Sequence, residues 1–150
     1  MDHDRALQRE FGAEAFRLVN SHRLKLEWVE SWDAWGSLRG EWDELLVRSR
    51  ADSIFLTWDW IASWIKVLGS RRTPLVGIVR DASSGKLCGA AVLYRAEYRL
   101  LKVLRVRALR PAADWPTGSE YPDWIAEPGQ EEAVLDALAR GLVDRARDWD

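Results

Sequence analysis

The stretch at positions 114–123 gathers the side chains of this chain that are best suited to chemistry. It reads Asp-Trp-Pro-Thr-Gly-Ser-Glu-Tyr-Pro-Asp and so combines carboxylates, hydroxyls and aromatic rings. Polar groups of this kind fix the orientation of a ligand, while aromatic rings supply contact area. Glu120 and Asp123 could act as an acid/base pair, but their spacing within a loop specifies no geometry. An ordinary turn-rich surface loop would have the same composition.

Other residue types that carry chemistry are few. His3 and His22 lie in a weakly patterned N-terminal stretch and are not credible catalytic residues or metal ligands. Cys88 is the single cysteine, which excludes an internal disulfide and a zinc site built from cysteines. Its place in a strand pattern predicts a small buried hydrophobic residue. We therefore expect no catalytic residue and no metal ligand set in this chain.

A basic run in the second half of the chain allows two interpretations. It could form a track for nucleic acid or phosphate, or the solvated face of a strand. Basic residues alternate there with apolar ones, no aromatic residues are interleaved from Arg99 to Arg110, and the net charge of the chain is −2. The solvated face is therefore favoured and nucleic acid is an unlikely partner. The run consists of Arg95, Arg99, Lys102, Arg105, Arg107 and Arg110.

Length and composition are those of one soluble globular domain. The chain has 150 residues, of which 47% are hydrophobic and 31% charged. No apolar run approaches the length of about 20 residues that is needed to cross a bilayer. The first five residues carry charges of both signs and begin no signal peptide. We expect a cytoplasmic protein with no membrane partner.

Tryptophan is the anomaly of the composition, because seven of the ten lie between Trp28 and Trp64. Indole rings can stack on sugars or bases, but large aromatic residues at helical spacing more often fill a core. The helical stripe predicts a core between two helices and a sheet. Trp58 falls off this stripe, so we expect it to be the most exposed. The stripe comprises Trp32, Trp35, Leu38, Trp42, Leu45 and Leu46, followed by Trp60, Ile61, Trp64, Ile65 and Leu68.

Periodicity and capping residues predict one strand, two helices, three strands and a last helix. Ser31 and Thr57 are expected to cap the first two helices, and Gly69 to end the second. Residues 1–23 are expected to form an N-terminal extension. The predicted strands span 24–28, 75–80, 87–94 and 98–109, with a turn at 81–86 and a short extended piece at 123–126. The predicted helices span 31–49, 57–68 and the stretch from 131, whose apolar face would comprise Leu135, Leu138, Leu142 and Trp149.

Several of these segments together resemble a known family. They are the segment 24–28, the helix with Trp-Asp-Glu-Leu-Leu at 42–46, the segment 53–60 with Trp64, the pair 74–80 and 85–93, and Ser-Glu-Tyr-Pro-Asp-Trp at 119–124. This pattern resembles the N-terminal half of GNAT-type acyltransferases of the CelD-like group, which is associated with cellulose biosynthesis and related to the FemAB peptidyltransferases. The resemblance covers most of the chain after residue 23.

The resemblance implies an α+β fold, with 24–150 as half of a GNAT-like, FemAB-type fold. It places the loop 114–124 near the interdomain cleft of the family, which favours substrate binding by Trp115, Glu120, Tyr121 and Asp123. Complete family members transfer an acyl group from acyl-CoA, whose pyrophosphate is held at a glycine-bearing turn. The corresponding stretch here, 105–113, has no glycine, and Pro111 lacks a donor N–H. No cofactor is therefore expected in this chain.

Three hypotheses follow. The chain is the non-catalytic N-terminal portion of an N-acetyltransferase-like protein, truncated or split from its catalytic C-terminal half. Alternatively, it is a stand-alone binding module for a sugar, a peptide or a protein partner. The third hypothesis, a nucleic-acid binder, has the least support. Under the first, an uncovered apolar face and a free sheet edge predict docking of a separate C-terminal half, or self-association.

Overall fold

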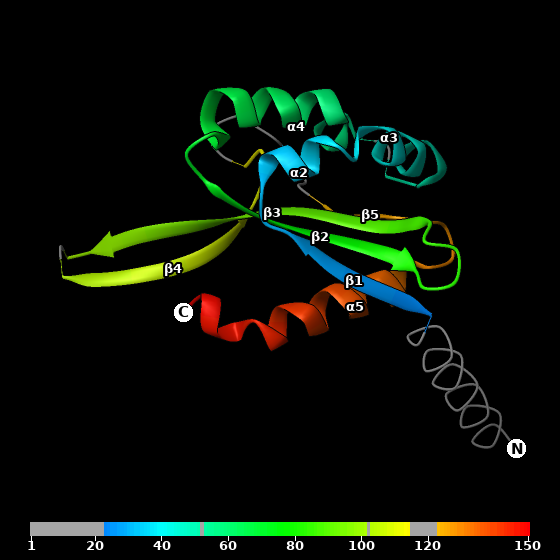
Figure 1. Cartoon of the computed structure of the whole chain (residues 1–150). Coiled ribbons are helices and arrows are strands. Elements are labelled where there is room, and N and C mark those ends of the chain that lie inside the picture. Colours follow the sequence, from blue (N-terminus) through cyan, green and yellow to red (C-terminus); the bar gives the residue numbers. More distant parts are fainter. Residues whose placement is uncertain (1–22, 52, 102, 115–122) are drawn as a thin grey trace, which may run out of the picture.

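A five-stranded antiparallel sheet organises the chain (Figure 1). The computed structural model describes residues 23–51, 53–101, 103–114 and 123–150. Strands β1 to β4 lie in chain order, each paired with the next, and β5 pairs with β3. The strands are β1 (Leu24–Val29), β2 (Thr73–Asp81), β3 (Leu87–Leu100), β4 (Leu104–Pro111) and β5 (Ile125–Ala126).

The hairpin that joins β2 to β3 forms where the sequence predicts it. The Asp81 carboxylate accepts hydrogen bonds from the backbone N–H groups of Ser83 and Ser84, at 3.0 and 2.9 Å. Gly85 has a φ of 72°, which a glycine adopts without steric cost. Side chains of β2 are buried on both faces, because helices cover the sheet above and below.

The predicted strand 98–109 is wrong, because a second hairpin turn interrupts it. Strand β3 continues to Leu100, and β4 begins at Leu104 and returns along β3. Leu101, in the turn, has a φ of 51°. Periodicity missed this turn because it contains none of the usual turn residues. Strand β2 pairs with β3 only as far as Arg95, so the paired segments 96–100 and 104–108 project beyond the rest of the sheet (Figure 1). We call this projection the arm.

The predicted helix 31–49 is two helices, α2 (Trp32–Gly36) and α3 (Arg39–Arg48). Ser31 caps the first as expected, with its hydroxyl accepting from the Ala34 N–H at 3.3 Å. The break at Ser37 and Leu38 lies between Gly36 and Gly40, the two residues of lowest helix propensity in this stretch. The break lets α2 and α3 follow different directions over the sheet.

The tryptophan-bearing helix begins at the predicted N-cap. The short helical turn η1 (Ile54–Leu56) leads into α4 (Trp58–Trp64), and the Thr57 hydroxyl accepts from the Trp60 N–H at 3.4 Å. The helix then widens into one π-type turn, η2 (Ile65–Gly69). Gly69 was expected to cap the C-terminus, but Ser70 takes that position. Gly69 instead allows close packing, because a Cβ there would lie 2.7 Å from the Trp64 ring.

Indole rings join the three helices to one another, as the core interpretation predicts. The rings of Trp35 and Trp58 are stacked, with centroids 3.6 Å apart and planes 10° apart. Trp42 meets both rings edge-on at 6.0 Å, and Trp64 packs against Tyr94 of β3 at 5.3 Å. The expectation that Trp58 is the most exposed is wrong, because only 6% of it is accessible. Trp58 lies off the apolar stripe of α4 because it packs against Trp35 of α2.

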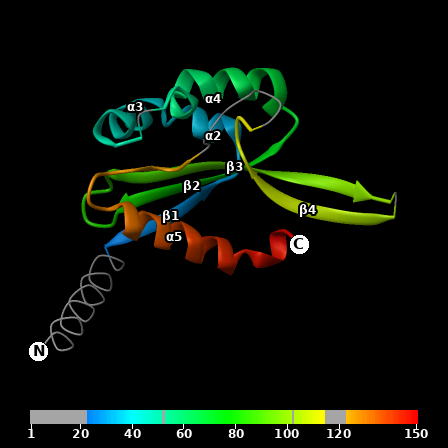
Figure 2. The same ribbon diagram turned by 180° about the vertical axis from the view of Figure 1, so that it is seen from behind.

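The opposite face of the sheet is covered by α5 (Glu131–Asp144), as Figure 2 shows from behind. This helix begins where predicted, but it buries Val134 and Leu138, whereas Leu135 is 42% exposed. Of the predicted face, Leu138 is buried and Leu142 half-buried, but Val134 takes the place expected of Leu135. It does so because it packs on Gly89 of β3, where a Cβ would lie 2.3 Å from it. The turn η3 (Ala146–Asp148) follows, and Trp149 is half-buried.

The architecture is thus α+β, with tryptophan-rich helices on one face of an antiparallel sheet, as expected. No helix among the described residues has the length and apolar character needed to span a membrane.

Candidate functional site

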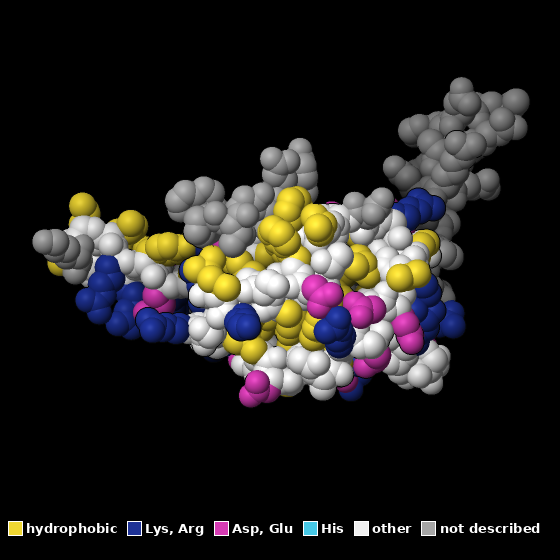
Figure 3. Space-filling view, turned by 90° about the horizontal axis from the view of Figure 1, so that it is seen from above, with side chains coloured by type: hydrophobic (Ala, Val, Ile, Leu, Met, Phe, Trp, Pro, Cys, Tyr) yellow, Lys and Arg dark blue, Asp and Glu magenta, His cyan; other side chains and the backbone are white. Residues whose placement is uncertain are grey.

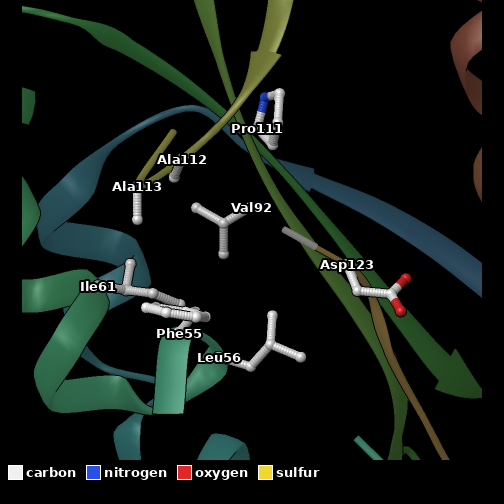
Figure 4. Close-up of a pocket in the computed structure, with 8 residues that line it drawn as sticks. All are labelled: Phe55, Leu56, Ile61, Val92, Pro111, Ala112, Ala113 and Asp123. Carbon is white, nitrogen blue, oxygen red and sulfur yellow. The ribbon is translucent and has the colours of Figure 1, made fainter. Parts of the chain in front are cut away.

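A hollow opens between the tryptophan-bearing helices and the start of the arm (Figure 4). It is open to solvent, and its cavity volume is about 20 Å³, little more than one water molecule needs. Seven of its eight lining residues are apolar, as is usual for small ligand sites. They come from η1, α4, β3, the end of β4 and the chain just before β5: Phe55, Leu56, Ile61, Val92, Pro111, Ala112, Ala113 and Asp123.

Local capping and packing position this lining. Ser53 accepts from the Phe55 N–H at 3.2 Å, and the buried Trp42 indole donates to the Leu56 carbonyl at 3.0 Å. On the other side, the Ala112 N–H donates to the Val92 carbonyl at 2.8 Å. Both walls are therefore fixed by hydrogen bonds to their backbone. Such a hollow is largely pre-formed, which favours binding because little ordering is needed.

A buried carboxylate lies next to the hollow. Asp114 is 6% exposed and follows directly on Ala113 of the lining. The Tyr94 hydroxyl donates to its two oxygens at 3.1 and 3.2 Å, and the Arg110 Nε forms an ion pair with it. Arg110 also donates to the Tyr98 hydroxyl at 2.8 Å. A buried charge requires such partners.

Cationic and aromatic groups surround Tyr94 in turn. The Arg72 guanidinium lies 4.6 Å from the centroid of the Tyr94 ring and 5.4 Å from that of Trp64. Burial raises the pKa of the Tyr94 hydroxyl above its ordinary value. The hydroxyl therefore stays protonated at neutral pH and remains a donor to Asp114. The arrangement fixes Asp114 and contains no activated nucleophile.

The structure describes only one of the four residues predicted to bind substrate. Trp115, Glu120 and Tyr121 lie outside the described residues, and with them the acid/base pair of Glu120 and Asp123. Asp123 lies at the rim of the hollow with its carboxylate turned away from the apolar side chains (Figure 4). It is exposed, and its Oδ1 accepts from the Trp124 N–H at 2.8 Å. Both ends of the predicted loop, Asp114 and Asp123, thus lie beside the hollow.

Sequence reasoning missed Tyr94, Arg110 and the apolar walls of the site. Tyr94 is two residues from Val92 on β3, so strand alternation alone places both on the helix-covered face. Arg110 was counted with the basic run, and nothing in the pattern distinguishes it from its neighbours. Its pairing with Asp114 depends on the bend of the chain after β4, which puts Ala113 at a φ of 57°.

The basic run is partly neutralised. Arg95 pairs with Glu30 and Asp148, and Arg107 pairs with Asp150 at 3.0 Å. These contacts draw the last residues of the chain against the base of the arm. Arg99 and Arg105 are exposed, as expected for a solvated face, and Lys102 lies outside the described residues.

The stretch 105–113, which was compared with a phosphate-binding turn, lies mostly in a strand. Residues 105–111 form β4, and no helix follows them directly. The turn that does precede a helix is 127–130, between β5 and α5. Gly129 has a φ of 82° there, and its N–H already donates to the Glu131 carboxylate at 2.7 Å. With Glu131 and Glu132 in its first turn, the N-terminus of α5 is negatively charged and disfavours a pyrophosphate.

Metal and thiol chemistry find no support in the part of the chain that the structure describes. It contains no cluster of His, Cys, Asp and Glu that could hold a metal ion. Cys88 is 1% exposed, as the strand pattern predicts, and burial raises the pKa of its thiol. A buried thiol with a raised pKa is not an activated nucleophile.

Comparisons of the chain with models of protein families, with curated protein sequences and with solved structures each found no match.

We predict that the Tyr94 hydroxyl stabilises the fold through Asp114. Tyr94→Phe would leave a buried carboxylate without one of its donors, at a cost of about 1–3 kcal/mol in the free energy of unfolding. Tyr98→Phe is the matched control, because Tyr98 is 39% exposed and its hydroxyl only accepts from Arg110. Urea denaturation measures both variants. Equal losses in the two would contradict this role of Asp114.

Proposed function

We propose that this chain is the non-catalytic, acceptor-binding portion of a GNAT-like acyltransferase. The order of its elements supports the proposal: a strand, helices on one face, an antiparallel meander and a helix on the other face. That is the arrangement expected of the first half of a GNAT fold. The hollow beside Asp114 would hold part of the acceptor, and the loop with Trp115, Glu120, Tyr121 and Asp123 would contact it.

The observation that carries the proposal is the outer edge of β4. The Ala112 N–H donates to β3, so the even-numbered residues of β4 also bond to β3. The odd-numbered residues therefore direct their backbone N–H and C=O groups away from β3. Arg107 is one of these. Its N–H donates to the Asp150 carboxylate, and its carbonyl accepts from the Asp150 N–H, both at 2.9 Å. Arg105 and Leu109 share this orientation, so a strand from a second half could pair along this edge by taking the place that Asp150 holds at Arg107.

The charge at the start of α5 supports placing acyl-CoA in that second half. A pyrophosphate needs free N–H groups at a helix N-terminus. Here the Gly129 N–H is already bonded to Glu131. Acyl transfer itself would take place only when the catalytic half is present.

The alternative, a stand-alone binding module, is favoured by a different observation. The walls of the hollow are held by hydrogen bonds within one folded unit, and the Tyr94–Asp114–Arg110 contacts beside it are already formed. A sugar, a peptide or a partner protein could therefore be bound without a second half.

We predict that the isolated chain does not bind acetyl-CoA. Calorimetric titration should show no saturable heat, since the first-turn carboxylates of α5 repel the pyrophosphate. Glu131→Gln with Glu132→Gln is the informative control, because binding that appears only in this variant would identify those carboxylates as the obstacle. Saturable binding by the wild type at about 1 μM, which corresponds to roughly 8 kcal/mol, would contradict the assignment.

We also predict self-association through the outer edge of β4. Light scattering at tens of micromolar protein should give a mass above that of the 17.2 kDa chain. Leu109→Pro removes an outward N–H without removing a bond to β3, so it should restore the monomer. Ala108→Pro is the contrasting variant, because it removes a bond within the sheet and should destabilise the fold. A monomeric wild type would count against the half-domain and favour the stand-alone module.

A further inference from the structure

The tip of the arm carries aliphatic side chains in water. Leu101 is 92% exposed and Val103 88%, and the flanking Leu100 and Leu104 are 51% and 57% exposed. The arm extends away from the helices and from the rest of the sheet in both ribbon views (Figures 1 and 2). Isolated exposed aliphatic residues are common, but four within one hairpin turn form a patch that suggests a binding surface.

The backbone at Leu101 indicates that this apolar character is not incidental. Its φ of 51° lies in the left-handed region, where glycine or asparagine is strongly preferred in a turn. A leucine there costs stability in the isolated fold, and the exposed side chain regains nothing by packing within the chain. Strain of this kind occurs where a function requires the residue.

The charge around the tip is positive. Arg99 precedes the apolar residues and Arg105 follows them, and both are exposed. Arg105 has a loose pair with Glu97 at 3.6 Å, in which both side chains are about 60% exposed. Figure 3 shows Lys and Arg side chains gathered beside the hydrophobic ones along the arm. Tyr98 lies next toward the body and is 39% exposed.

We propose that the arm binds a lipid surface that contains acidic headgroups. Leu100, Leu101, Val103 and Leu104 would enter the boundary between headgroups and acyl chains. Arg99 and Arg105 would meet lipid phosphates and carboxylates, and Tyr98 would lie at headgroup level, where aromatic side chains with a polar end are favoured. The apolar tip and its basic flanks thus match the two layers of an anionic membrane surface.

Charge and composition favour this occupant over two others. A second copy of the chain would bring like-charged tips together, which is unfavourable. A nucleic acid would use the arginines but would leave four aliphatic side chains in water, since bases stack on aromatic rings. The expectation of no membrane partner rested on the lack of a segment that could cross the bilayer. A tip that enters only the headgroup layer needs no such segment.

Vesicle co-sedimentation of the full chain tests the proposal. One set of vesicles is phosphatidylcholine alone, and the other contains roughly one third phosphatidylserine. The wild type should sediment with the acidic vesicles and much less with the neutral ones. Leu101→Asn with Val103→Asn should weaken this binding by roughly tenfold or more, because the tip loses its apolar area. Arg99→Glu with Arg105→Glu should abolish the preference for acidic lipid.

Separate controls test whether the variants remain folded. Asparagine tolerates a left-handed φ, so Leu101→Asn should not lower the thermal stability of the chain. Val47→Asn is the matched surface control, because Val47 is 86% exposed on α3, away from the arm, and should bind as the wild type does.

Three results would overturn the proposal. One is a wild type that does not sediment with acidic vesicles, and another is a tip variant that binds them as the wild type does. The third is a tip variant that abolishes self-association in light scattering while vesicle binding is absent, which would assign the tip to a second copy. If only Leu109→Pro loses self-association, the result concerns the edge of β4 and does not bear on lipid binding by the tip.

Discussion

The stacked pair of Trp35 and Trp58 is the contact on which the helical layer depends. It joins α2 to α4, and Trp42 of α3 completes the group by meeting both rings edge-on. None of these helices is long enough to be stable in water by itself. Burial of large rings stabilises them together, and Trp64 extends the cluster to Tyr94 of the sheet. The helices are therefore held by one aromatic cluster and not by separate stripes.

The candidate site lies at the edge of this cluster and uses its rigidity. The Trp42 indole fixes Leu56 in one wall, while the neighbouring Tyr94 donates to Asp114, where the predicted substrate loop departs. The buried polar groups there hydrogen-bond to one another. This suits a pre-formed binding surface and not proton transfer or nucleophilic attack. The polar edge of β4 and the apolar tip of the arm are separate surfaces on the same hairpin. Each would engage a different partner by different chemistry.

Local signals predicted the local structure well. Ser31 and Thr57 cap helices because their hydroxyls bond backbone N–H groups within three residues, and the Asp81 turn is fixed in the same way. The predictions that failed concern features that are set by contacts between residues distant in the sequence. Trp58 is buried by α2 and not by its own helical stripe. The face of α5 is chosen by Gly89 and Gly77, whose missing side chains admit Val134 and Leu138. The turn at Leu101 contradicts local preference, so no pattern could reveal it. Of the site, the loop ends were predicted, but Tyr94 and Arg110 meet Asp114 only in the fold.

Tryptophan fluorescence tests the central claim that the indole cluster is the core of this fold. Trp35, Trp42, Trp58 and Trp64 are each less than 7% exposed, whereas Trp124 is 38% exposed. The Trp124→Phe variant removes this exposed emitter, and its spectrum is recorded folded and in urea. The account predicts folded emission at clearly shorter wavelength than free indole in water, moving to that position on unfolding. Folded emission that already coincides with free indole would show that the rings are in water and would contradict the account.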